Sequence, residues 1–365
     1  LYPKVTAPGG TKHTVIAWIW ARTVISPNPA NPIETPLVRS WWLSKRKGKE
    51  AWVKATVVDG QVRYEVQHNA DGPKKDEDGT RVGRGGISLA DGTPISADYI
   101  KEQGVQRGLG SHLIAIVAED KKGRLYLSPN AEHMAVSLVK APDNVPRQEL
   151  PYDPRNIWTP AYGLTNFSDL FTNRQLVALT TLSDLVSEAR NKVLEDALAA
   201  GIPAGERLEG GGAGAEAYAD AVATYLALGV SRTADYCNAL CTWNINRDGV
   251  AHLFTRQAIP MVWDYVETNI LSNSSGNFLG QLGWIAKVIQ NTPAQANGVS
   301  SHVNAVSRDY VDLVVSTDPP YYDNISYSDL SDFFYVWLRK SLRTIHPSVV
   351  GTMLTPKADE LVANP

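Results

Sequence analysis

The residues best suited to chemistry lie near the C-terminal end, in the string Asp318-Pro319-Pro320-Tyr321. An exocyclic amine on an aromatic ring is a poor nucleophile, because its lone pair is delocalised into the ring. The Asp318 carboxylate and the Pro319 carbonyl would each accept a hydrogen bond from one of the two N–H groups of such an amine. The two prolines would stiffen the turn. Tyr321 would stack on a base swung out of its duplex. This order of residues favours methyl transfer to an amino group, with a purely structural turn as the alternative.

The elements around this string would have to position it. The apolar run 311–316 predicts a buried parallel strand that ends at the motif, and 330–339 predicts an aromatic helix after it. Ligands of open α/β sheets bind at the carboxyl ends of the strands, where this string would lie. The adjoining residues Tyr322, Asp323 and Asn324 are therefore predicted to contact the substrate.

A second candidate surface is basic and aromatic. Residues 1–135 contain 19 Lys and Arg against 14 Asp and Glu, although the whole chain has a net charge of −3. Basic residues beside paired indoles suit a phosphate backbone and an unstacked base. The alternative is a strand that leads into a solvated turn. The residues predicted to contact DNA are Arg39, Trp41, Trp42, Lys45, Arg46, Lys47 and Lys49.

The chain divides by composition into three predicted regions. Residues 1–140 are β-rich, with Asp59-Gly60 as a hairpin turn between two β-branched runs. Residues 141–300 are mainly helical, with helices expected over 168–200, 216–244 and 250–267. Residues 301–365 carry the motif and are expected to be part of an α/β methyltransferase sheet.

Several segments together resemble a known family. The string Thr317–Arg339, with 14–23, 36–40 and 354–361, is similar to the prokaryotic adenine-specific DNA methylases that contain a zinc ribbon. The resemblance implies a Rossmann-like methyltransferase sheet with a large insertion, S-adenosylmethionine as cofactor, DNA as partner and adenine N6 as the methylated atom. Cytosine N4, RNA, protein or a non-catalytic nucleic-acid-binding module with a vestigial motif remain alternatives.

The chain departs from that family in three respects: at Ser26 and Asn31, around Gly86 to Gly92, where a second ribbon region has no cysteine, and at the cofactor loop. Ser26 and Asn31 stand where ribbon cysteines are often found, so we expect no zinc. The glycine clusters 83–86 and 210–214 do not lie between a strand and a helix, as a cofactor loop requires. The first residue is Leu1, and we expect a partial chain whose cofactor site is completed by an upstream portion of the same protein or by a partner chain.

Composition limits the remaining possibilities. The two cysteines, Cys237 and Cys241, exclude a disulfide scaffold, fit a reducing cytoplasm and are predicted to be buried core thiols on the second helix. The apolar runs are far below the roughly 20 residues of a membrane span. We therefore expect a cytoplasmic protein without a membrane partner.

Overall fold

The computed structural model describes residues 1–75, 77–121, 123–292, 304–318, 322, 325–358 and 360. These residues form two compact units, and neither is a continuous stretch of chain. The first contains Leu1–Thr180 and Thr233–Gly280, and the second contains Thr181–Arg232 and Gln281–Pro365.

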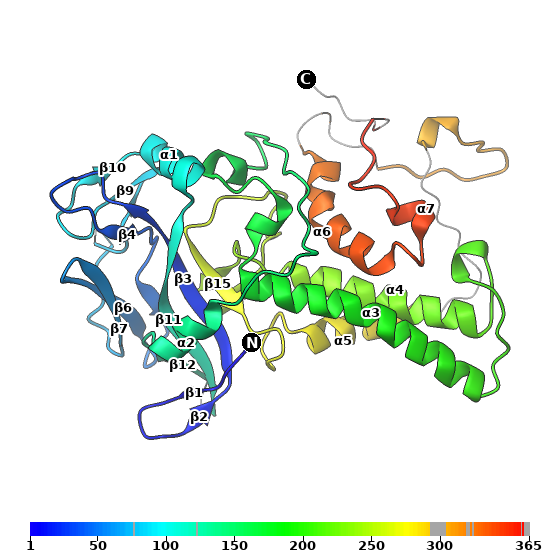
Figure 1. Ribbon diagram of the computed structural model, residues 1–365, viewed down its shortest axis with the longest axis horizontal. Helices are drawn as coiled ribbons and strands as arrows, with labels where there is room; N and C mark the ends of the chain where they lie inside the picture. Colours follow the sequence, from blue (N-terminus) through cyan, green and yellow to red (C-terminus); the bar gives the residue numbers. More distant parts are fainter. Residues whose placement is uncertain are drawn as a thin grey trace. The chain divides into compact units, whose positions relative to one another are not determined.

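The first unit is built on a sheet in the order β12-β11-β3-β15, with β4 also paired to β3. Its strands are β3 (Val15–Ile25), β4 (Glu34–Pro36), β11 (Gly110–Asp120), β12 (Gly123–Leu127) and β15 (Asp264–Thr268). β3 lies in the middle of this sheet (Figure 1). It is rich in β-branched and aromatic residues and is buried along nearly its whole length, as expected for a central strand.

A second sheet of the same unit has the order β5-β6-β7. Its strands are β5 (Trp42–Ser44), β6 (Ala51–Val58) and β7 (Gln61–Gln67). Asp59 and Gly60 both have positive φ, at 52° and 72°, and form the two-residue turn between β6 and β7. The hairpin predicted there is confirmed. Such a turn is favoured because it twists in the same sense as the strands that it joins.

The remaining elements of the first unit are short. They are β1 (Val5–Thr6), β2 (Lys12–His13), β8 (Arg81–Val82), β9 (Gly85–Ile87), β10 (Pro94–Ile95), α1 (Ala97–Arg107), α2 (Ala131–Ser137), η1 (Thr159–Tyr162), η2 (Phe167–Leu170), β13 (Thr242–Asn244) and β14 (Gly249–Ala251). Ser96 caps α1 by accepting a hydrogen bond from the Tyr99 backbone, and Asn130 caps α2 in the same way through His133.

The core of the first unit lies between its two larger sheets. Ile16, Val53, Ile114, Trp243 and Val266 belong to one apolar cluster that draws on strands of both. Among the most buried polar groups is an ion pair: Arg174 donates to both carboxylate oxygens of Glu267 at 2.9 and 2.6 Å. The Trp20 indole and the Thr172 hydroxyl also donate to Glu267, so this buried carboxylate is well satisfied.

The helix predicted over 250–267 is wrong. This segment forms β14 and then β15, and Val266 and Tyr265 pair with Ile19 and Trp20 of β3. The helix predicted over 216–244 also ends early, because α4 covers Ala215–Ala234 and β13 follows. β15 forms on the available edge of β3 and β13 pairs with β14, since strand formation depends on packing partners more than on local propensity.

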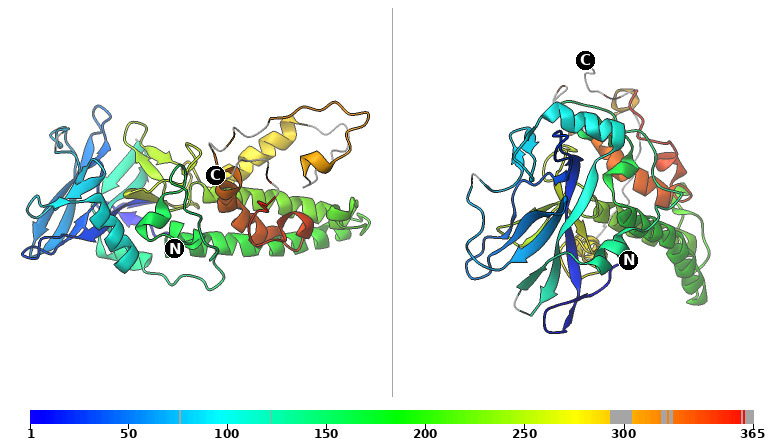
Figure 2. Two further views of the ribbon diagram at one scale, coloured as in Figure 1. Left: turned by 90° about the horizontal axis from the view of Figure 1, so that it is seen from above. Right: turned by 60° about the vertical axis from the view of Figure 1, so that its left-hand side comes forward.

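The second unit is helical. It contains most of α3 (Asn173–Ala199) and α4 (Ala215–Ala234), which lie side by side in both views of Figure 2, as well as η3 (Leu208–Gly210). Arg190 joins the two helices by ion pairs with Glu216 and with Asp220. The other helices are α5 (Phe278–Asn291), which begins in the first unit, η4 (Ala305–Ser307), α6 (Tyr327–Leu342) and α7 (Pro347–Val350).

The overall class is mixed α and β, with antiparallel pairing of every strand in the described ranges. The buried parallel strand predicted over 311–316 is wrong: Val311 and Asp312 form a turn, and residues 313–318 have no regular secondary structure. Val314 is fully exposed, and Val311 and Leu313 are more than half exposed. An apolar run becomes a buried strand only beside neighbours that pair with it and cover it. The described residues supply none for this run.

Candidate functional site

The motif near the C-terminus lies only partly within the described residues. Asp318 is exposed and belongs to an irregular segment before α6. Tyr322 is 76% exposed and has a positive φ of 53°. The other residues predicted to act here, Pro319, Pro320, Tyr321, Asp323 and Asn324, lie outside the described residues.

A polar cluster on α6 was missed by the sequence reasoning. Asp332 is fully buried, and its Oδ1 accepts hydrogen bonds from the Thr355 backbone at 2.8 Å and from the Thr355 hydroxyl at 2.7 Å. The Lys357 ammonium lies 2.6 Å from Asp332 Oδ2. Burial raises the pKa of the neighbouring Asp329, with Lys357 acting in the opposite direction. These interactions join α6 to the segment 354–357.

The basic stretch is engaged with carboxylates of the first unit. Arg39 forms a two-point ion pair with Asp264, whose two oxygens lie 2.6 and 3.1 Å from its guanidinium nitrogens. Lys45 lies 3.7 Å from Asp78, and Arg46 lies 3.1 Å from Asp248. Lys47 and Lys49 are exposed. Arg39, Lys45 and Arg46, which were predicted to contact phosphates, therefore already have an acidic partner.

The paired indoles have different environments. Trp41 is 6% exposed and belongs to the apolar core, so its ring is not accessible to a base. Trp42 is half-buried, donates its indole N–H to the Pro73 carbonyl at 3.1 Å and has the Lys45 ammonium over its ring. Because one ring lies in the core and the other is half-buried, the two adjacent indoles do not form one stacking surface.

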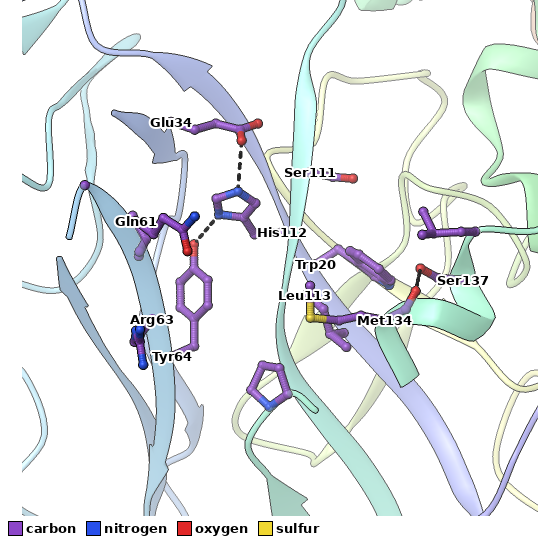
Figure 3. A pocket seen from close by; sticks show the side chains of 14 residues that line it. Trp20, Glu34, Gln61, Arg63, Tyr64, Ser111, His112, Leu113, Met134 and Ser137 are labelled. Atoms are coloured by element: carbon purple, nitrogen blue, oxygen red, sulfur yellow. Dashed lines mark hydrogen bonds and ion pairs between the residues drawn. The ribbon is translucent and has the colours of Figure 1, made fainter. Parts of the chain in front are cut away.

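A pocket of about 690 Å³ lies elsewhere in the first unit, around the first half of β11 (Figure 3). His112 lies on one side of β11 with Glu34 and Tyr64, whereas Trp20 and Met134 lie on the other side. The volume is typical of sites that hold small ligands or side chains.

The polar side of this pocket is a chain of hydrogen bonds. The Tyr64 hydroxyl lies 2.8 Å from His112 Nδ1, and His112 Nε2 lies 3.1 Å from Glu34 Oε2. Glu34 also accepts a hydrogen bond from the Thr23 hydroxyl. A carboxylate only accepts, so a neutral His112 donates from Nε2 and accepts the Tyr64 proton at Nδ1. Residues 34, 64 and 112 are far apart in the sequence, and no spacing pattern signals this arrangement.

The electrostatics of the pocket keep the phenol neutral. Burial, with the nearby Glu34 carboxylate adding to it, raises the pKa of Tyr64. The neutral phenol donates its hydrogen bond to His112 and retains oxygen lone pairs that can accept from a ligand. Exposed Arg63 adds a cation to the lining. The polar side of the pocket thus offers the Tyr64 oxygen and the Glu34 carboxylate as acceptors.

The thiols and glycine clusters do not form a ligand site in the described residues. Cys237 and Cys241 are buried and unpaired with each other, as predicted, but they follow α4 rather than lie on it. Burial raises the pKa of both thiols. No group of three or more His, Cys, Asp or Glu in the described ranges could hold a metal. Gly83–Gly86 lies at the β8–β9 turn, which is not a strand-to-helix turn.

No family model, curated protein or solved structure matches this chain. Among the helices that the structure describes, none has the length and apolar character needed to span a membrane. The assignment of function therefore depends on the residues themselves.

Proposed function

We propose that this chain supplies the target-base side of an S-adenosylmethionine-dependent methyltransferase that acts on an exocyclic amine in DNA, most specifically adenine N6. The observation that carries the proposal is the sequence Thr317-Asp318-Pro319-Pro320-Tyr321-Tyr322 directly before the aromatic helix α6. Asp318 accepts a hydrogen bond from one N–H group of the amine, and the Pro319 carbonyl accepts a hydrogen bond from the other. Tyr321 stacks on the base.

Two further observations support this proposal. Asp318 is exposed, as a residue that meets a macromolecular substrate must be. The Asp332 interactions with Thr355 and Lys357 join two of the segments on which the resemblance to amino-methyltransferases rests. A buried, fully hydrogen-bonded carboxylate of this kind fixes the start of α6 against 354–357.

The cofactor would supply the transferred methyl group. The described residues do not fit its binding, because no glycine-rich turn among them joins a strand to a helix. The donor site in this proposal belongs to an upstream portion of the protein or to a partner chain.

The test is a radiolabelled methyl-transfer assay with the full-length protein and unmethylated genomic DNA, followed by digestion to nucleosides. Asp318→Ala and Asp318→Asn should each lower turnover at least ~10²-fold, the scale of removing one polar catalytic group. DNA affinity should change little. N6-methyladenine is the expected product. Detection of N4-methylcytosine would instead identify cytosine as the target base.

Asp312→Asn is the matched control. Asp312 is also an exposed aspartate of this segment, and asparagine tolerates its positive φ of 58°. Turnover of this variant should remain near that of the unaltered protein. Near-normal turnover of both Asp318 variants would refute the catalytic assignment, and DNA binding without methyl transfer in the unaltered protein would favour a non-catalytic module.

A further inference from the structure

The first half of β11 has one edge without a partner strand. β12 pairs with β11 only from Ile116 to Asp120, whereas β3 pairs with β11 from Gly110 onward. If the pairing of β12 with β11 continued beyond Ile116, Pro129 would lie opposite Ile114. Proline has no backbone N–H to donate to the neighbouring strand. The Ser128 hydroxyl instead accepts a hydrogen bond from the Val66 backbone. Within the described parts of the chain, residues 110–115 thus keep an unpaired edge.

The backbone groups on this edge are identified by the bonds of β3. Arg22 N donates to the Trp263 carbonyl, and Arg22 O accepts from Leu37 N, so both groups point away from β11. Ser111 lies opposite Arg22 and is therefore in a non-hydrogen-bonded pair. Leu113, two residues further along β11, lies opposite Trp20 and is also in a non-hydrogen-bonded pair. The N–H and C=O groups of Ser111 and Leu113 accordingly point toward the unpaired edge.

The pocket lies along this edge and has two different sides. Trp20, Leu113, Met134 and Leu138 line an apolar side, and Met134 and Leu138 are 51% and 85% exposed. Figure 3 shows Glu34, His112 and Tyr64 on the opposite side of β11. Because side chains of a strand alternate between two faces, a strand added here would place alternate side chains in the apolar and polar sides.

We propose that this edge of β11 binds an extended polypeptide segment of another protein by strand addition. The bound segment alternates apolar residues with residues that carry a neutral amide. The apolar residues lie opposite Ser111 and Leu113 and contact Trp20 and Met134. An amide side chain lies opposite His112, where it donates to Tyr64 Oη or Glu34. An amide N–H group suits these two acceptors, whereas a carboxylate placed there would be repelled by Glu34.

The geometry sets the length of the segment. Residues 110–115 span about 20 Å at about 3.4 Å per residue. A segment of five or six residues therefore covers the edge. Main-chain hydrogen bonds supply affinity in this mode of recognition, and the alternating pockets supply specificity. This site is independent of the methyl-transfer proposal, because none of its residues belongs to the Asp318 motif.

The test uses a fluorescein-labelled, end-blocked hexapeptide of alternating leucine and glutamine, with fluorescence anisotropy as the readout. Two further peptides carry N-methyl groups on all leucines or on all glutamines. Alternate amides of a strand face opposite edges, so one methylated peptide should bind at least about tenfold more weakly while the other binds like the parent. Equal binding of all three peptides, or no saturable binding of the parent, would overturn strand addition.

Ser111→Pro is the informative variant of the protein. It removes an N–H that faces the unpaired edge without removing a bond to β3, and proline is tolerated on such edges. It should weaken binding of the parent peptide by about tenfold. Ser111→Ala keeps the N–H and should bind normally. Far-UV circular dichroism shows whether both variants fold. If Ser111→Pro does not fold, the comparison of the two N-methylated peptides with the parent peptide tests the proposal.

Other occupants would appear as contrary results. Displacement of the peptide by a single-stranded oligonucleotide would assign the edge to nucleic acid. A concentration-dependent dimer in sedimentation that Ser111→Pro abolishes would assign it to a second copy of this chain. Either result overturns the proposal of a separate polypeptide partner.

Discussion

At the scale of single residues, the buried carboxylate of Glu267 has three partners. Arg174, Trp20 and Thr172 all donate to it, and both members of the Arg174–Glu267 pair are at most 1% exposed. The guanidinium of Arg174 also lies over the Trp18 ring, 3.9 Å from its centroid. Removing one member would leave a buried charge without its partner.

Glu267→Ala should therefore lower the free energy of unfolding by about 3–5 kcal/mol. Urea titration followed by tryptophan fluorescence measures this decrease. Glu267→Gln keeps the volume and the neutral hydrogen bonds, so it should destabilise the protein less than the alanine variant. A decrease below about 1 kcal/mol for Glu267→Ala would contradict the assignment of this pair to the core.

Asp220 is a second residue whose charge is held by arginines. Burial by itself raises the pKa of Asp220, but hydrogen bonds from Arg207 and Arg190 outweigh it, and the pKa is lowered. These guanidinium nitrogens lie 2.6 and 2.7 Å from its oxygens. A lowered carboxyl pKa means that the folded state favours the ionised form.

The stability from Asp220 should be fully present above its unfolded pKa of about 3.9 and lost as the pH falls through its lower folded pKa. Asp220→Asn should remove this part of the acid dependence. Urea unfolding of both proteins at neutral and acid pH, followed by far-UV circular dichroism, measures the difference. Asp196→Asn is the control, because Asp196 is exposed and its pair with Lys192 contributes little. Equal acid sensitivity of Asp220→Asn and the unaltered protein would contradict the expectation.

At the scale of elements, β3 is the strand on which the larger sheet of the first unit depends. It pairs with β11 on one side and with β15 and β4 on the other. β7 forms the edge of the other sheet, and all its residues except Val66 are exposed or partly buried. Local opening should therefore expose β7 well before β3.

Backbone amides of Val15–Ile25 should exchange with solvent more slowly than those of Gln61–Gln67. Hydrogen–deuterium exchange with peptide-level mass spectrometry compares the two strands in one experiment. Both are strands of the same unit, so β7 is an internal control. Equal exchange would mean that the central position of β3 does not control the opening of its sheet.

At the scale of the whole molecule, charge is distributed unevenly along the chain. The basic excess falls in residues 1–135, and the rest of the chain is acidic. The structure sets Arg39, Lys45 and Arg46 beside Asp264, Asp78 and Asp248. This pairing reduces the number of cations that are available to release counterions from DNA.

Changing Lys45, Arg46, Lys47 and Lys49 together to glutamine should flatten the salt dependence of DNA binding by up to about 0.9 for each phosphate that is no longer neutralised. Lys47→Gln alone should account for at most one phosphate. Binding titrations across a range of salt concentrations measure the slopes, with Lys101→Gln as a control outside the run. An unchanged slope in the fourfold variant would assign the run to a solvated turn.

Local sequence determined those elements whose partners are close along the chain. The turn Asp59-Gly60 joins β6 and β7 because its residues tolerate positive φ, and the repeat of apolar residues in 176–193 forms most of α3. The burial of Cys237 and Cys241 also followed from their chemistry. In each case the residues and a few neighbours contain the necessary information.

Only the tertiary structure decided where partners come from distant segments. The segment 264–268 becomes a strand because β3, far earlier in the chain, offers it an edge, whereas 311–316 has no such edge in the described residues. The Glu34–His112–Tyr64 chain likewise depends on three strands meeting. A pattern read along the chain reports local preference, but pairing and burial depend on interactions between segments that the order of residues alone does not reveal.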